Sequence, residues 1–232
     1  MVETKARGEA SPHTAIRPTL DEGQQLAPHK LDASAPAQLD ASAPTRQRDR
    51  LRSLRSELIA EGAEPGRHLP ELERRASTWP ASPGRRRDFL LDTGAVFSLS
   101  SNPNLLIDYI DLLERFGGSF LIPLVVLGEV ITGEPSRDVP IHRLLDVVTG
   151  GEDGYVPLTD EIANRAGALL YQVRQSSGPV APLDAPIDGM VVATAEDLSA
   201  DSAVTILTTD PEEIGALVGV TGRTSIAVDV PG

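Results

Sequence analysis

Four acidic residues stand out because each one ends an apolar run or lies on the helix expected directly after it. They are Asp92 in FLLDTGAVFSL, Glu129 in LIPLVVLGEVITG, Asp188 in DAPIDGMVVATA and Asp210 in VTILTTDPEEI. A carboxylate near buried apolar segments costs desolvation energy unless something compensates it. No Lys follows residue 30 and Arg is scarce in this region, so a divalent cation is the expected compensation. Oxygen-only ligands favour Mg²⁺ or Mn²⁺, which makes metal-dependent phosphodiester hydrolysis the leading hypothesis.

Any such acid can also be a solvated helix end, an N-cap or a turn residue. We prefer that interpretation for Asp160, Asp184 and Glu212. Asp92 and Asp210 each follow at least four apolar residues, where an unpaired acid is rare. Asp188 would also make a good helix cap, and Asp184 is a nearby alternative to it.

The elements that must position these acids alternate between strand and helix from Arg87 onward. Strands are expected at 88–92, 119–124, 155–159 and 204–210, with an edge strand at 224–230. Helices are expected at 104–118, around Glu129, at 139–151, from Asp160 onward, at 184–198 and after Pro211. This alternation predicts the α/β fold class, with a mainly parallel sheet of four to five strands flanked by helices on both faces.

Functional residues of an open parallel sheet gather at the carboxyl ends of its strands, near the switch point in strand order. We therefore expect Asp92, Glu129, Asp188 and Asp210 to meet at one rim. Clustered carboxylates repel one another, so their pKa values should rise in the absence of metal and metal binding should release protons.

The first third of the chain has a different character. Residues 1–47 are rich in Pro, Ala, Ser and Gln, repeat LDASAPAQ as LDASAPTR, and are expected to form a disordered extension. Residues 48–86 are expected to be a short helical segment and linker, in which Leu51, Leu54, Leu58 and Ile59 share one helical face. The remaining part, 87–232, is the expected catalytic domain.

The composition limits the kinds of site, the cellular compartment and the mode of substrate binding that are expected. The chain has 232 residues and no Cys, which excludes disulfides, zinc–thiolate sites and cysteine nucleophiles and fits a reducing cytoplasm. No signal peptide or membrane span is recognisable. From Asp88 onward 22 acidic residues face 6 Arg, a net charge of −16, while residues 1–87 carry +3. A nucleic-acid substrate would thus have to be held locally, by a metal and a few Arg.

The four acids and their surroundings resemble the PIN-domain family, particularly the VapC-type toxin ribonucleases of toxin–antitoxin pairs. The matching segments are LDTGAVFSL, IPLVVLGEV, DGMVVATA and ILTTDPEEI, with the acids separated by 37, 59 and 22 residues. The resemblance covers about residues 87–232, and each motif is weak alone whereas four in order are specific. The 86 residues before it have no counterpart in the minimal family domain.

The resemblance implies a PIN-like metal-dependent endoribonuclease that hydrolyses RNA phosphodiesters, as the toxin of a type II toxin–antitoxin system. Carried over by position, Asp92, Glu129, Asp188 and Asp210 are the catalytic residues and the ligands of Mg²⁺ or Mn²⁺. Thr208 and Thr93 would support the site by hydrogen bonding. A cognate antitoxin and a homodimer formed through the first helices of the domain are the implied partners. The alternatives are a housekeeping PIN nuclease for RNA processing and an inactive PIN-like interaction module.

Two other enzyme classes share part of the pattern. DTGA is also the triplet of aspartic proteases, but those are all-β and need a second triplet or a dimer. An aspartyl-nucleophile phosphatase would need a second Asp at position 94, where this chain has Gly. A separate hypothesis concerns the Arg-bearing segment 48–77, which could lie over the acidic groove and inhibit it; an ordinary surface helix is the simpler interpretation.

Overall fold

The computed structural model describes residues 43–149, 154–177 and 186–231. All of them belong to one compact unit, Leu39–Gly232. The repeat and most of the extension expected at 1–47, as well as Asp184, lie outside the described residues.

Five parallel strands form a single sheet in the order β3-β2-β1-β4-β5. Their bounds are β1 Arg87–Leu91, β2 Phe120–Pro123, β3 Tyr155–Val156, β4 Ala203–Leu207 and β5 Ile226–Asp229. Every residue of β1 and β4 is buried, as expected for central strands covered on both faces. The chain runs from β1 outward to β3 and then returns to β4 on the other side of β1. The switch point therefore lies between β1 and β4.

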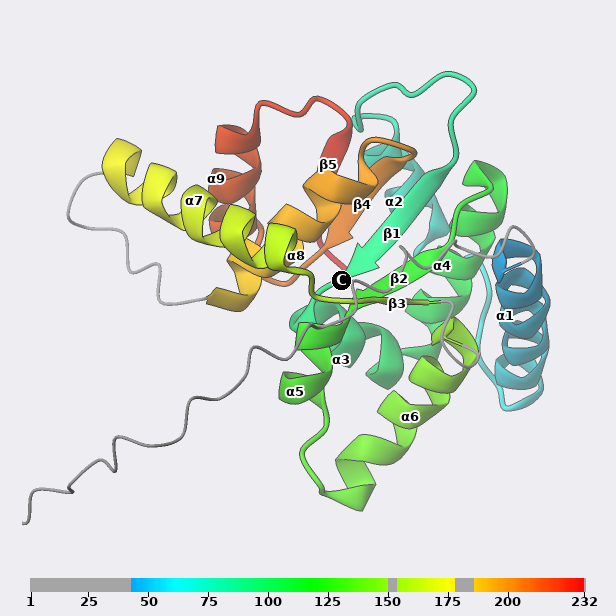
Figure 1. The fold of residues 1–232 in the computed structure, drawn as a ribbon. Coiled ribbons are helices and arrows are strands. Elements are labelled where there is room, and N and C mark those ends of the chain that lie inside the picture. Colours follow the sequence, from blue (N-terminus) through cyan, green and yellow to red (C-terminus); the bar gives the residue numbers. More distant parts are fainter. Residues whose placement is uncertain (1–42, 150–153, 178–185, 232) are drawn as a thin grey trace, which may run out of the picture. The chain divides into compact units, whose positions relative to one another are not determined.

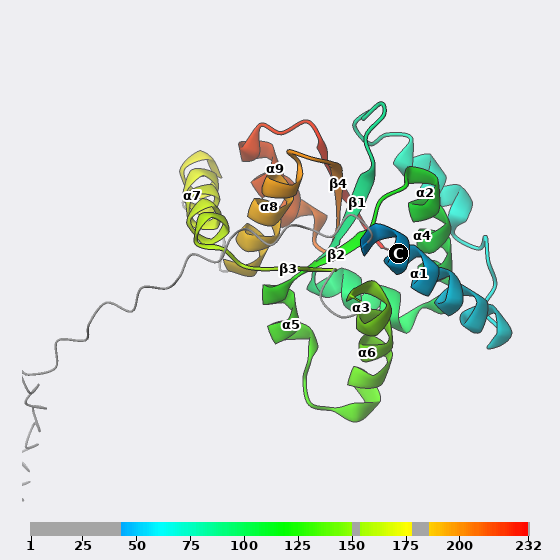
Figure 2. The same ribbon diagram turned by 45° about the vertical axis from the view of Figure 1, so that its right-hand side comes forward.

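Helices cover both faces of this sheet (Figures 1 and 2). On one face α3 (Thr93–Ser101) and α4 (Pro103–Phe116) contact β1, and α6 (Pro135–Thr149) contacts β2. On the other face α8 (Pro186–Leu198) contacts β4 and β2, α9 (Pro211–Thr221) contacts β5, and α7 (Asp160–Ser177) packs on both helices. The short helix α5 (Leu124–Val130) follows β2 directly.

Local sequence explains where several helices begin and end. Asn102 caps α4, Pro103 occupies its first turn, and Gly117 ends it in the left-handed conformation at φ 66°. The third strand was expected to extend to 159 but stops at Val156, because Pro157 has no N–H to continue the ladder. The fourth strand ends at Leu207 rather than at Asp210, which is the N-cap of α9.

The segment before β1 forms two helices, α1 (Ala43–Ala60) and α2 (Leu69–Ala76), that pack on α4 and, for α1, also on α6. Leu51, Leu54, Leu58 and Leu72 are at most 6% exposed and join the same hydrophobic core as the sheet. The Gln47 side chain donates to the carbonyl of Phe120 at 2.8 Å and accepts from its N–H at 2.9 Å. These helices are part of the folded unit, and the Arg-rich α1 contacts α4 and α6.

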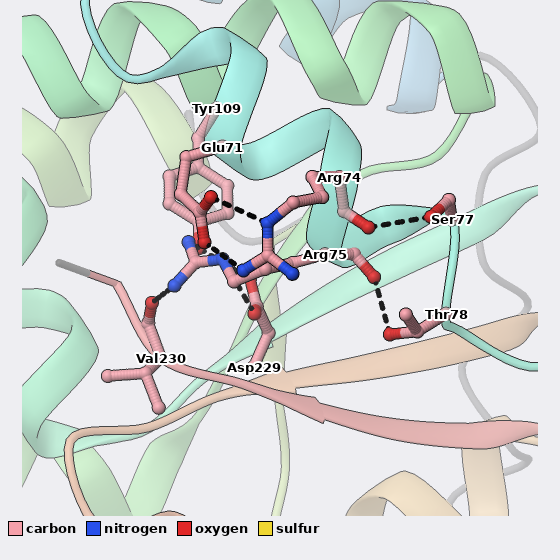
Figure 3. A network of polar contacts seen from close by, with 8 residues as sticks. All are labelled: Glu71, Arg74, Arg75, Ser77, Thr78, Tyr109, Asp229 and Val230. Carbon is pink, nitrogen blue, oxygen red and sulfur yellow. Dashed lines mark hydrogen bonds and ion pairs between the residues drawn. The ribbon is translucent and has the colours of Figure 1, made fainter.

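A buried polar network ties α2 to the last strand (Figure 3). Arg75 Nε lies 3.3 Å from Asp229 Oδ1, and the Tyr109 hydroxyl donates to Asp229 Oδ2 at 2.8 Å. Arg75 also donates to the carbonyl of Val230. Burial raises the pKa of Asp229, and the bond from Tyr109 and the charge of Arg75 oppose that rise. Removing Arg75 would leave a buried carboxylate without its cation.

In the parts of the chain that the structure describes, no helix is long and apolar enough to cross a membrane.

Candidate metal and phosphodiester site

Asp92 directly follows β1 and is the N-cap of α3, which places its carboxylate at the carboxyl end of the central strand. It accepts a hydrogen bond from the backbone N–H of Ala95 at 2.6 Å and another from the Thr208 hydroxyl. The residue is only 8% exposed. Burial raises the pKa of Asp92, and these hydrogen bonds oppose the rise. A carboxylate in this position would be stabilised by a cation at the rim.

Thr208 connects two of the expected acids. It follows β4, whose last residue, Leu207, lies in register with Leu91 of β1. Its side chain is fully buried, donates to Asp92 and accepts from the backbone N–H of Asp210 at 2.9 Å. A single hydroxyl group thus fixes the position of Asp92 relative to the turn that carries Asp210.

The turn between β4 and α9 lies against the first turn of α3. A Cβ atom added at Gly94 would lie 1.9 Å from Thr209 Oγ1, so this close approach requires glycine. Asp210 caps α9 by accepting from the backbone N–H of Glu213 at 3.3 Å, and its side chain is exposed. Asp92 and Asp210 therefore lie at the same edge of the sheet, at the switch point.

Asp188 lies in the first turn of α8 and belongs to the same cluster. Its pKa is raised to about 7, first by burial and then by the negative charges of Glu213, Asp92 and Asp210. The Glu213 carboxylate also forms a hydrogen bond with it. The charged neighbours that dominate the pKa of Asp188 are all acidic.

Glu129 lies on α5, and its side chain reaches the start of α3, next to Asp92. Thr93 Oγ1, in the residue after Asp92, donates a hydrogen bond to Glu129 Oε2. The bond fixes an otherwise exposed carboxylate beside the start of α3. The structure thus brings Asp92, Asp188 and Asp210 into one acidic cluster, and links Glu129 to its edge through Thr93.

As the side chains lie, no group of three or more acids or His among the described residues is close enough to hold a metal ion. Each carboxylate is instead engaged by a protein donor or by another carboxylate. The donor set, oxygen-only and short of cations, fits a hard divalent ion. Binding one requires these side chains, which repel one another without it, to rotate from their present positions.

Glu213 is the cluster residue that sequence reasoning missed. It lies in the first turn of α9, where an acid is common simply because it complements the helix dipole. Its spacing of three residues from the capping Asp210 is the signal that places both on one side of the helix start.

The raised pKa of Asp188 predicts a measurable effect on stability without metal. Between pH 4 and 7 the folded protein keeps a proton that the unfolded chain releases, so the free energy of unfolding falls as pH rises. We expect Asp188→Asn to raise that free energy at pH 8 by about 1–2 kcal/mol, a value reduced for the half-exposed carboxyl, and to change it little at pH 4.

Urea unfolding in EDTA at both pH values tests this expectation. The exposed Asp197, further along α8, provides the matched control Asp197→Asn. A gain for Asp188→Asn that is equal at pH 4 and pH 8 would contradict the electrostatic origin.

Comparison with known proteins gives structural matches only. No protein-family model matches the chain, and no curated protein matches it. Solved structures similar to it include DNA-bound VapBC from Salmonella typhimurium, at 18% identity and a TM-score of 0.42. VapBC-1 from nontypeable Haemophilus influenzae matches at 14% identity and 0.44, and FitAcB from Neisseria gonorrhoeae at 19% and 0.42. Each match covers 62% of this chain and 97–98% of the other.

The fold class itself follows from the strand order and from the helices on both faces of the sheet. The described residues form the expected α/β fold, with a wholly parallel five-stranded sheet.

Proposed function

We propose that the chain is a Mg²⁺- or Mn²⁺-dependent endoribonuclease, acting as the toxin component of a type II toxin–antitoxin pair. The observation that carries the proposal is the convergence of Asp92, Asp188, Asp210 and Glu213 at the switch point of the sheet. Burial and the negative charges of these neighbours raise the pKa values of Asp92 and Asp188. Such a cluster is costly to the fold, and a bound cation at a phosphodiester-cleaving site offsets that cost.

The metal would supply a bound water with a lowered pKa and would offset negative charge on the scissile phosphate. Asp92, Glu129, Asp188 and Asp210 are the proposed ligands, directly or through water. Glu213 is a further carboxylate within reach through Asp188.

The remaining roles belong to groups of this chain. Thr208 holds Asp92 and the Asp210 turn at a fixed separation, and Thr93 orients Glu129. Asp188, with a pKa of about 7, keeps a proton near neutral pH in the absence of a cation. Bringing a cation to the cluster favours release of that proton, so metal affinity should increase with pH.

An antitoxin protein and an RNA strand are the proposed partners, together with a second copy of the chain. The sequence resemblance places the homodimer at the first helices of the domain, α3 and α4. In this structure α1 and α2 pack against α4, so a dimer surface there has to include them or adjoin them.

Thermal unfolding with added Mn²⁺ tests the metal site. We expect Mn²⁺ at a hundred times its dissociation constant to stabilise the protein by about 2.7 kcal/mol, because it binds the folded state alone. Asp92→Asn should lose this shift, while the control Asp197→Asn should keep it. Equal responses of the protein and Asp92→Asn would remove the metal site and favour an inactive interaction module.

Growth on induced expression separates the two enzymatic alternatives. A toxin arrests growth through cleavage of cellular RNA, and the arrest disappears with Asp92→Asn. Metal-dependent RNA cleavage without growth arrest would instead favour a housekeeping nuclease.

A further inference from the structure

Arg137, in the first turn of α6, lies over the ring of Phe97 from α3. Its guanidinium carbon is 4.4 Å from the ring centroid. The residue is exposed, so its N–H donors can reach solvent while the guanidinium lies over the ring. Stacking of this kind restricts the side chain without using its hydrogen-bonding capacity.

Two links place Arg137 beside the acidic rim. Phe97 lies four residues after Thr93 on α3, so their side chains are on the same helical face, about 6 Å apart. Thr93 in turn holds Glu129. A line of contacts therefore runs from the rim along one side of α3 to the guanidinium.

The connection between α5 and α6 supplies the second link. The buried Asp138 accepts hydrogen bonds from the backbone N–H of Thr132 at 3.2 Å and of Gly133 at 2.6 Å. This fixes the turn that begins just after Glu129 and ends at the start of α6. Arg137 directly precedes Asp138, so this turn as well as Phe97 limits how far the guanidinium can lie from Glu129.

Charge makes Arg137 unusual in this acidic part of the protein. Most other Arg residues after Asp88 pair with carboxylates: Arg115 with Glu73, Arg143 with Glu57 and Glu61, and Arg165 and Arg223 with Glu196. Arg137 has no ion pair with any described residue. A guanidinium left without an anion beside a cluster of carboxylates points to an anionic ligand.

We propose that Arg137, placed over Phe97, binds a phosphate of the RNA strand next to the phosphodiester that is cut. This inference rests on the proposed function and names Arg137 as the side chain that positions the substrate. The planar fork of Arg suits two phosphate oxygens, and Phe97 leaves its ring edge beside the strand. The alternative is an Arg that merely covers Phe97, which would contribute to stability but not to binding.

The test is the binding of a fluorescently labelled single-stranded RNA, with Asp92→Asn in every protein so that the strand stays intact. We expect the further change Arg137→Ala to weaken binding about five- to tenfold and to reduce the slope of log affinity against log salt by about 0.7. Arg137→Lys should restore the salt slope but only part of the affinity. Arg223→Ala is the matched control, because Arg223 precedes β5 and lies at the opposite end of the sheet.

Equal affinity and salt slope for Arg137→Ala and the Arg223→Ala control would overturn the phosphate contact, as would an absence of RNA binding in all variants. Cleavage by the protein with Asp92 intact is measured in parallel. Unchanged kcat/KM in Arg137→Ala would overturn this inference and leave the nuclease proposal standing. Absence of metal-dependent cleavage would overturn the nuclease proposal, and the binding series would still decide the role of Arg137.

Discussion

Asp92→Asn is expected to lower the rate of metal-dependent RNA hydrolysis by about a thousandfold, which corresponds to roughly 4 kcal/mol of lost transition-state stabilisation. Asp92 is the most buried of the four expected acids and lies at the centre of the cluster, where it contacts Thr208 and influences Asp188. Asn is uncharged and a much weaker ligand for a hard cation.

The same substitution should leave the fold intact, which makes the loss of activity interpretable. Asn is as good an N-cap as Asp, so the bond to the Ala95 N–H that begins α3 can be kept. Because burial raises the pKa of Asp92, removal of its charge should keep or increase thermal stability at neutral pH. Initial rates on a cleavable RNA and a melting curve measure both effects. A variant that loses activity together with its cooperative melting transition would contradict this assignment.

Deleting residues 1–86 is expected to abolish folding rather than to release an inhibited enzyme. The deletion removes α1 and α2, whose buried Leu51, Leu54, Leu58 and Leu72 lie in the core together with Trp79. Burial of five such side chains contributes about 10 kcal/mol. This is comparable to the whole stability of a domain, about 5–15 kcal/mol.

The same deletion would leave buried carboxylates without their hydrogen-bond and ion-pair partners. The fully buried Asp108 accepts from the backbone N–H groups of Gly66 and His68, both at 2.6 Å, and Asp229 has Arg75 as its cation. Circular dichroism and limited proteolysis of the truncated protein test the expectation. A chain that lacks only residues 1–38 is the control, because none of the contacts named above involves these residues, and its melting temperature should stay the same.

Arg75→Met examines the same contact without removing a helix. It should destabilise the protein by about 3 kcal/mol, whereas Arg74→Met, which breaks the exposed pair with Glu71, should leave stability nearly unchanged. The deletion of residues 1–86 has an outcome that would contradict this expectation. If the chain that starts at Arg87 melts cooperatively and gains ribonuclease activity, segment 48–77 is an inhibitor, and its packing on α4 is dispensable.

The placement of Asp92 and Asp210 could be predicted from the sequence because it depends on local rules. An acid directly after an apolar strand lies at the carboxyl end of a parallel sheet, and β1 and β4 proved to be neighbours at the switch point. The polar partners of these acids were harder to predict from the sequence. That Thr208 bonds both Asp92 and the Asp210 turn depends on the register of two strands separated by more than a hundred residues.

Other features could not be predicted because their determinants lie far apart or are ambiguous. Glu213 is indistinguishable in sequence from an ordinary acid at a helix start. The pairing of Arg75 with Asp229 joins a helix that precedes the first strand to the last strand of the sheet, and nothing local in either segment indicates it. The helical pattern after Arg48 predicted an amphipathic helix, but not that α4 and α6 would be the surface that receives it.

The attachment of α2 to β5 has a consequence for synthesis on the ribosome. Arg75 is made early, yet the carboxylate that balances it belongs to Asp229, in the last strand. The ion pair that attaches α2 to the sheet can therefore form only after Asp229 has left the exit tunnel. Chaperone binding to nascent chains should persist until β5 has emerged, and a ribosome stalled just before Ile226 should display a protease-sensitive amino-terminal segment.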